Sequence, residues 1–229
     1  MSFKKKASKG IVFVLVGVVL LSLIDESCAS DTSIKLSNNQ KEAIIEHLEE
    51  NHISKSKQKK FIEKVELNEE LDSSKYIKNN DLKLEVDLND NESKKLYKSF
   101  EDGSFISIEV EDTSPSEIAT YGLTYNGKKI TGSNGLATQT YYINTRPHRN
   151  NSKYTVLTDA YAISTSIIFG TIENEKIIKH RTWEDKNNPV WVDGYAKFNY
   201  FGNQWISVWQ ATGGVRTKIK DNKLSVTLY

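Results

Sequence analysis

The sequence predicts a mainly β protein, an antiparallel β-sandwich or jelly-roll-like domain preceded by a short α-helical hairpin. Segments with strand-like alternation recur at hairpin spacing after residue 94, and residues with turn chemistry separate them. Two short segments with helical periodicity come earlier, between residues 37 and 67. All four tryptophans follow residue 112, as expected if most strands lie there, because strands favour aromatic residues.

Residues 1–29 have the features of a secretory signal peptide. Four lysines near the N-terminus precede an unbroken apolar run at 11–21, and small residues around Cys28 follow. We therefore expect a secreted protein, cleaved after Ala29 or Ser30. Two alternatives stay open. One is a permanent anchor, for which the run is shorter than the roughly 20 apolar residues required. The other is a lipoprotein with its lipid on Cys28.

Cleavage at this site removes Cys28, the one cysteine of the sequence. The mature chain is then cysteine-free, so it can form no disulfide and no thiolate metal site. Small secreted domains of animals are usually stapled by disulfides. An exported protein without them fits a Gram-positive bacterium better.

Residues 30–67 predict the helical hairpin. Ser37 is placed to cap a first helix at 40–50, whose apolar residues fall on one face. Asn51 and His52 end it, and Ser54 is placed to cap a second helix. A pair of this length is too short to fold stably alone, so we expect it to dock on the rest of the chain.

Residues 68–93 are polar and acidic, and they predict a linker with one edge strand at 82–86. Residues 94–229 form the predicted β-sandwich domain. Asp102-Gly103 and Asn126-Gly127 are expected as hairpin turns, and Asp221-Asn222 closes the last pair of strands. Other strands are expected at 138–145, 154–172, 176–183, 195–210, 215–219 and 224–228.

A family resemblance adds to this interpretation. The helical segment begins with Gln40-Lys41-Glu42, an exit at 69–73 reads Glu-Glu-Leu-Asp-Ser, and a turn at 100–105 reads Phe-Glu-Asp-Gly-Ser-Phe. Together these resemble exported Gram-positive proteins with a helix pair and a β-rich tail. Some of those are similar to large, heat-labile, unmodified bacteriocins of the geobacillin type. The resemblance implies an antibacterial activity and supplies no catalytic or binding residues.

The sequence contains no arrangement that predicts catalysis. His47 and His52 are expected on different helix faces, which excludes a metal pair. Asp159 is the one acid of the tail within a strand pattern, an isolated inward candidate without the second carboxylate that glycoside hydrolysis needs. We expect no enzymatic activity, no catalytic residue, no cofactor, no metal and no nucleic-acid partner, and we predict no oligomeric state.

The basic and aromatic tail is the feature that points to a partner. Exposed Trp rings stack on sugars or lie at membrane interfaces, and Lys side chains attract anionic surfaces. The alternative is that these rings fill the core. The candidates for contact with bacterial membrane or cell-wall polymer are Trp183, Trp191, Trp205, Trp209, Lys218 and Lys220. The sequence thus predicts a secreted antibacterial protein or, alternatively, a secreted surface- or glycan-binding module that does not kill.

Overall fold

The computed structural model describes residues 35–80, 82–113, 126–168, 170–200 and 209–229. Ser33–Tyr229 form one compact unit. The predicted signal peptide, residues 1–29, lies outside the described residues. In the described part of the chain, no helix is both long and apolar enough to cross a membrane.

The described residues form three helices and ten strands, which makes the protein mainly β. The helices are α1 (Asn38–Glu50), α2 (Lys55–Glu66) and α3 (Asp72–Asn79). The strands are β1 (Lys83–Asp87), β2 (Lys94–Ser99), β3 (Phe105–Thr113), β4 (Asn126–Ser133), β5 (Ala137–His148), β6 (Asn151–Ile167), β7 (Gly170–Arg181), β8 (Val190–Tyr200), β9 (Trp209–Lys220) and β10 (Lys223–Leu228).

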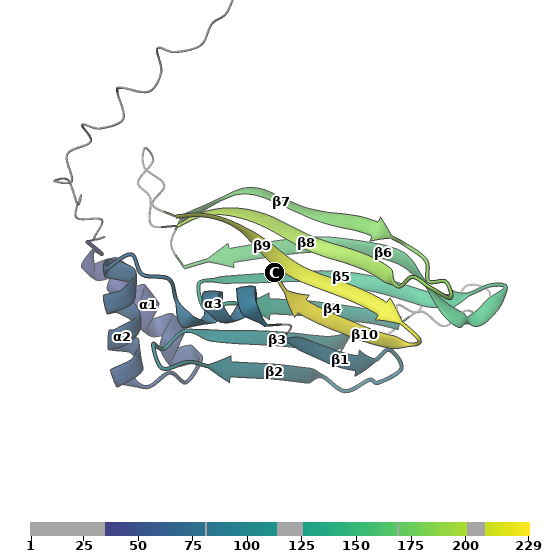
Figure 1. Ribbon diagram of the computed structural model, residues 1–229, viewed down its shortest axis with the longest axis horizontal. Coiled ribbons are helices and arrows are strands. Elements are labelled where there is room, and N and C mark those ends of the chain that lie inside the picture. The colour runs from purple at the N-terminus through teal and green to yellow at the C-terminus, as the bar shows by residue number, and fades with distance from the viewer. Residues whose placement is uncertain (1–34, 81, 114–125, 169, 201–208) are drawn as a thin grey trace, which may run out of the picture. The chain divides into compact units, whose positions relative to one another are not determined.

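The strands form two antiparallel sheets of five (Figure 1). The first sheet has the order β2-β3-β4-β5-β6, and the second has the order β1-β10-β9-β8-β7. The β2–β3 hairpin pairs Ser99 with Phe105 around a turn in which Gly103 has a φ of 83°. Asp221 and Asn222 also have positive φ between β9 and β10. Both predicted turns are therefore confirmed.

One hydrophobic core lies between the two sheets, in a β-sandwich-like arrangement. Fully or almost fully buried side chains from both sheets meet there, including Ile108, Ile130 and Tyr141 from the first and Val192 and Val226 from the second. Because successive side chains of a strand point to opposite faces, each sheet keeps a second face for other contacts. The outer face of the second sheet carries the candidate site described below.

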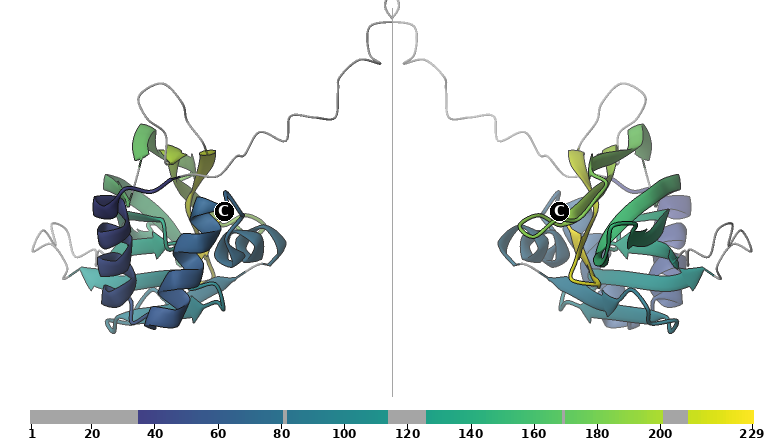
Figure 2. Two further views of the ribbon diagram at one scale, coloured as in Figure 1. Left: turned by 90° about the vertical axis from the view of Figure 1, so that its left-hand side faces the viewer. Right: turned by 90° about the vertical axis from the view of Figure 1, so that its right-hand side faces the viewer.

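A second hydrophobic cluster joins α1 and α2 to one end of the sheets (Figure 2). Ile44, Leu48 and Phe61 of the helices pack there with Phe105 and Phe198 of the strands. In α1 the predicted cap is present as a capping box, in which the side chains of Ser37 and Gln40 each accept a hydrogen bond from the other residue's backbone N–H.

The second helix, α2, begins after its N-cap Ser54, as the sequence predicts, but the side chain of Ser54 makes no capping hydrogen bond. Its hydroxyl lies 3.2 Å from that of Ser56 instead. His52, one of the two residues predicted to end the first helix, has a φ of 59°, which turns the chain between α1 and α2.

The segment 68–93 is not the linker that the sequence predicts. It contains α3, which the sequence analysis missed, and β1, the predicted edge strand, which pairs with β10 at the edge of its sheet. Asp102 and Ser104 hold the start of α3, since their side chains accept hydrogen bonds from the backbone N–H groups of Asp72 and Ser73. Long-range contacts therefore override the polar composition of this segment.

Two strand predictions also need correction. Asn126-Gly127 is no hairpin turn but the start of β4, where Gly127 pairs with both Thr113 and Asn144. A Cβ atom on Gly127 would lie 2.4 Å from the Thr113 hydroxyl, so close approach explains this glycine. The predicted strand 154–172 is two strands, β6 and β7, which belong to different sheets. Gly170, with a φ of 130°, begins the second.

Candidate binding surface around Trp191

The outer face of the second sheet gathers aromatic and cationic side chains around Trp191. In β8, the buried Val190 and Val192 point to the core, so Trp191 and Asp193 lie on the outer face. The same alternation in β9 places Arg216 and Lys218 outward. Strand register then pairs Trp191 with Lys218 and Asp193 with Arg216.

Asp193 organises this surface. Its carboxylate is buried and accepts hydrogen bonds from Arg216 Nε and Nη2, both at 3.0 Å, and from Trp191 Nε1 at 2.8 Å. His180 Nε2 lies 3.1 Å from the same carboxylate. Burial alone would raise the pKa of Asp193, but the hydrogen bonds from Arg216 and Trp191 and the charge of Arg216 outweigh it, so its pKa is lowered.

The half-buried indole ring of Trp191 lies among the side chains of His180, Arg216 and Lys218. The His180 ring stacks on it with 4.4 Å between the centroids. The Arg216 guanidinium lies 5.0 Å from the ring centroid, and the Lys218 ammonium lies 4.9 Å from it. These distances are within the range of cation–π attraction, worth about 0.5–1 kcal/mol at exposed sites. Lys218 is exposed and makes no ion pair with any residue that the structure describes.

Tyr229 adds a second ring beside Arg216, with 4.5 Å between the guanidinium and the ring centroid. Burial and the nearby charge of Asp193 raise the pKa of the Tyr229 phenol to about 12. Its hydroxyl donates a hydrogen bond to the Gly194 carbonyl at 3.3 Å. We call the surface formed by the following residues the contact face: His180, Trp191, Asp193, Arg216, Lys218 and Tyr229.

Trp183 lies in the loop after β7, and Lys220, the last residue of β9, contacts the same loop. Trp183 is 49% exposed, and the Arg181 guanidinium lies 4.1 Å from its ring centroid. Lys220 donates to the backbone carbonyls of Asp185 and Lys186. Because these bonds hold the loop, Lys220 is less available to a ligand than Lys218.

The structure thus brings two of the six predicted contact residues, Trp191 and Lys218, onto one surface. Trp205 lies outside the described residues. Trp209 is the first residue of β9 and pairs with Tyr200, while its side chain lies outside the described part.

The sequence analysis missed the residues that order the surface. His180, Asp193 and Tyr229 were not predicted as contact residues, since the sequence pattern places Asp193 in a turn and His180 between Lys179 and Arg181. The alternation Val190-Trp191-Val192-Asp193 could have placed Asp193 on the face of Trp191. Asp159, predicted as an inward acid, is exposed and pairs with Lys179 at 2.9 Å. It lies on the solvent side of β6.

The described part of the chain contains no group of three or more His, Cys, Asp or Glu side chains that could hold a metal ion.

No protein-family model matches the sequence, and the comparison with curated proteins finds no significant match. Among solved structures, a hypothetical protein from Listeria monocytogenes EGD-e, determined at 2.75 Å, aligns with 63% of this chain and 100% of its own. The two share 13% identity at a TM-score of 0.33.

Proposed function

We propose that the protein is secreted, has no enzymatic activity and binds an anionic polymer or membrane of the bacterial envelope through the contact face. The observation that carries the proposal is the Trp191 ring, which is held on an outer sheet face with His180, Arg216 and Lys218 around it. Such a ring offers stacking area, and the cations attract negative charge.

The supporting argument is preorganisation. Asp193 fixes both Trp191 and Arg216 by hydrogen bonds, so little side-chain freedom is left for a ligand to remove. Lys218 is not fixed in this way and supplies the free positive charge. Attraction to an anionic surface through Lys218 should weaken as salt concentration rises.

We also propose the finer features of the architecture. The two sheets act as a β-sandwich, and α1 and α2 form a helical hairpin docked on its end. We propose meander connections and not those of a jelly roll. Jelly rolls are built from Greek keys, whereas most neighbouring strands in these sheets are also consecutive in the sequence. A signal peptide cleaved after Ala29 or Ser30 would deliver this unit outside the cell.

Antibacterial activity against related bacteria is the consequence that we propose for this binding. It is supported by the export signal, by the resemblance to bacteriocins and by the basic aromatic surface. The second candidate is a binding module without killing activity. It uses the same contact face, and the preorganised Trp191 supports it equally.

The experiment compares the chain from residue 30 onwards with two charge reversals, Lys218→Glu and Lys95→Glu. Lys95 is an exposed lysine on the first sheet and serves as the matched control. Binding to washed Gram-positive cells and to anionic vesicles is measured by sedimentation at two salt concentrations. We expect Lys218→Glu to weaken binding several-fold and Lys95→Glu to leave it unchanged.

Equal binding by all three proteins would contradict the proposed face. Clearing zones on bacterial lawns, lost after heating, would support the antibacterial activity. Saturable binding without loss of viability would support the module without killing activity.

A further inference from the structure

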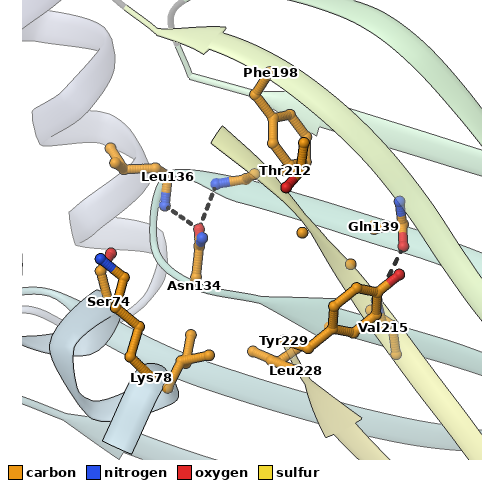
Figure 3. Close-up of a pocket in the computed structure, with 15 residues that line it drawn as sticks. Ser74, Lys78, Asn134, Leu136, Gln139, Phe198, Thr212, Val215, Leu228 and Tyr229 are labelled. Carbon is orange, nitrogen blue, oxygen red and sulfur yellow. Dashed lines mark hydrogen bonds between the residues drawn. The ribbon is translucent and has the colours of Figure 1, made fainter. Parts of the chain in front are cut away.

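A pocket opens between the two sheets at the end where α3 packs (Figure 3). Its walls come from α3, the β4–β5 turn, the end of β8, β9 and the C-terminal residues Leu228 and Tyr229. It shares Tyr229 with the contact face, and none of its other lining residues belongs to that face. No sequence motif points to it, since its residues come together from five separate parts of the chain.

The pocket has the volume of a single aromatic ring. Its volume is about 190 Å³. This is enough for one ring, because an apolar cavity of about 150 Å³ is known to hold one benzene molecule. Glycines form part of its wall, and a Cβ atom on Gly132 would lie 2.5 Å from side-chain carbons of Val215 and Leu228. Backbone therefore lines the pocket where larger residues would not fit.

The walls are mainly apolar. Leu136, Val215 and Leu228 contribute aliphatic carbons, and Phe198 and Tyr229 contribute rings (Figure 3). Aromatic side chains favour offset or edge-to-face packing with another ring. The walls thus favour a ring over an extended alkyl chain.

A few polar groups at the pocket have spare hydrogen-bonding capacity. The amide oxygen of Asn134 accepts from the backbone N–H groups of Leu136 and Ala137, which leaves its NH₂ group without a partner among the described residues. The hydroxyls of Ser74 and Thr212 also make no hydrogen bond to a described residue. Gln139, by contrast, is engaged at both ends, by Val215 N and the Thr165 hydroxyl.

We infer that this pocket binds a small uncharged molecule with a single aromatic ring system and one hydrogen-bonding group, of the size of phenol or indole. The ring lies against the apolar walls, and its polar group meets Asn134, Ser74 or Thr212. Apolar pockets with few placed polar groups are the usual form of small-molecule sites. The inference does not depend on the proposed envelope binding.

The test follows backbone amide signals of the chain from residue 30 by NMR while indole or phenol is added. Gly132, Gly213 and Gly214 are reporters in the wall, and Gly127, at the opposite end of β4 from Gly132, is the reference. We expect saturable shifts of the three wall glycines, with a dissociation constant of about 1 mM or tighter, as suits a ligand of so few atoms. The Gly127 signal should not move.

Two variants of α3 provide the control. Ser74→Trp fills the pocket from its lining and should weaken binding at least tenfold, whereas Lys75→Trp places the same ring on an exposed neighbour that does not line it. Retained binding in Lys75→Trp would show that a tryptophan added to α3 does not by itself undock the helix. Absence of saturable shifts with both probes, or unchanged binding in Ser74→Trp, would overturn the inference. Tighter binding of octanoate than of either ring would overturn the ligand class.

Discussion

At the scale of single residues, Asp193 shows how a buried acid can order a surface of aromatic and basic side chains. Its carboxylate accepts hydrogen bonds from Arg216 and Trp191 and lies beside His180. These three residues come from three adjacent strands. The lowered pKa of Asp193 keeps it ionised over the whole physiological range. Arg216 of the contact face is thus held in place by a buried charge, whereas Lys218 is not.

His47 gives a prediction about pH. It lies on α1 with its ring 5.7 Å from that of Phe105, and its Nε2 is buried without a partner among the described residues. Burial lowers the pKa of His47, although Glu50 and the Gly135 backbone act in the opposite direction. The unfolded chain therefore binds a proton more readily than the folded one, and stability falls as pH drops below about 6.5, the ordinary value.

The measurement is urea unfolding at pH 7.5 and pH 5.5. We expect a lower free energy of unfolding at pH 5.5, and we expect His47→Phe to reduce that difference. His52, an exposed residue five positions later, is the control. A pH dependence that survives in His47→Phe but disappears in His52→Phe would contradict this assignment.

At the scale of elements, the turn between β2 and β3 is also the docking site of α3. Asp102 is buried and accepts hydrogen bonds from Ser104, from the backbone of Asp72 and from Lys64. Burial alone would raise its pKa, but these bonds together lower it. A single turn residue thus ties the hairpin to the start of α3 and to α2.

Replacing Asp102 should release these groups. We expect Asp102→Ala to lower the free energy of unfolding by about 1–3 kcal/mol, because buried donors lose their acceptor. The neighbouring Glu101, whose side chain is exposed, is the matched control, and Glu101→Ala should change stability by less than about 0.5 kcal/mol. Chemical denaturation of both variants measures these changes. Equal losses of unfolding free energy in the two variants would contradict the role of Asp102.

The same elements show what the sequence could and could not predict. The hairpin at 100–105 was predictable because Asp102-Gly103 acts locally, and the edge strand at 82–86 was predictable from its alternation. The partner of that strand was not predictable, since Val86 pairs with Leu224 far along the chain. Composition identified Trp191 and Lys218 for the site, but only strand register brings Asp193 and Arg216 together.

At the scale of the whole molecule, two hydrophobic clusters meet on strands β3, β5 and β8. One lies between the sheets, and the other joins α1 and α2 to their end. The sequence analysis separated a helical segment, a linker and a β domain. In the structure, β1 and α3 connect these parts by pairing and hydrogen bonding, and Ser33–Tyr229 form one compact unit.

This organisation predicts that helices and sheets unfold together. Phe61 of α2 is fully buried against Phe105 and Phe198 of the strands, so Phe61→Ala should destabilise the whole unit by about 3–5 kcal/mol. Helix loss, followed by far-ultraviolet circular dichroism, and loss of tertiary structure around the tryptophans, followed by fluorescence, should occur at one shared midpoint. That midpoint should move equally for both probes in the variant.

If the helices formed an independent unit, Phe61→Ala would shift the helix signal alone, since every tryptophan lies in the β-rich half. Coincident transitions in the native chain and in the variant would therefore mean that the helical segment is part of the core that supports the contact face.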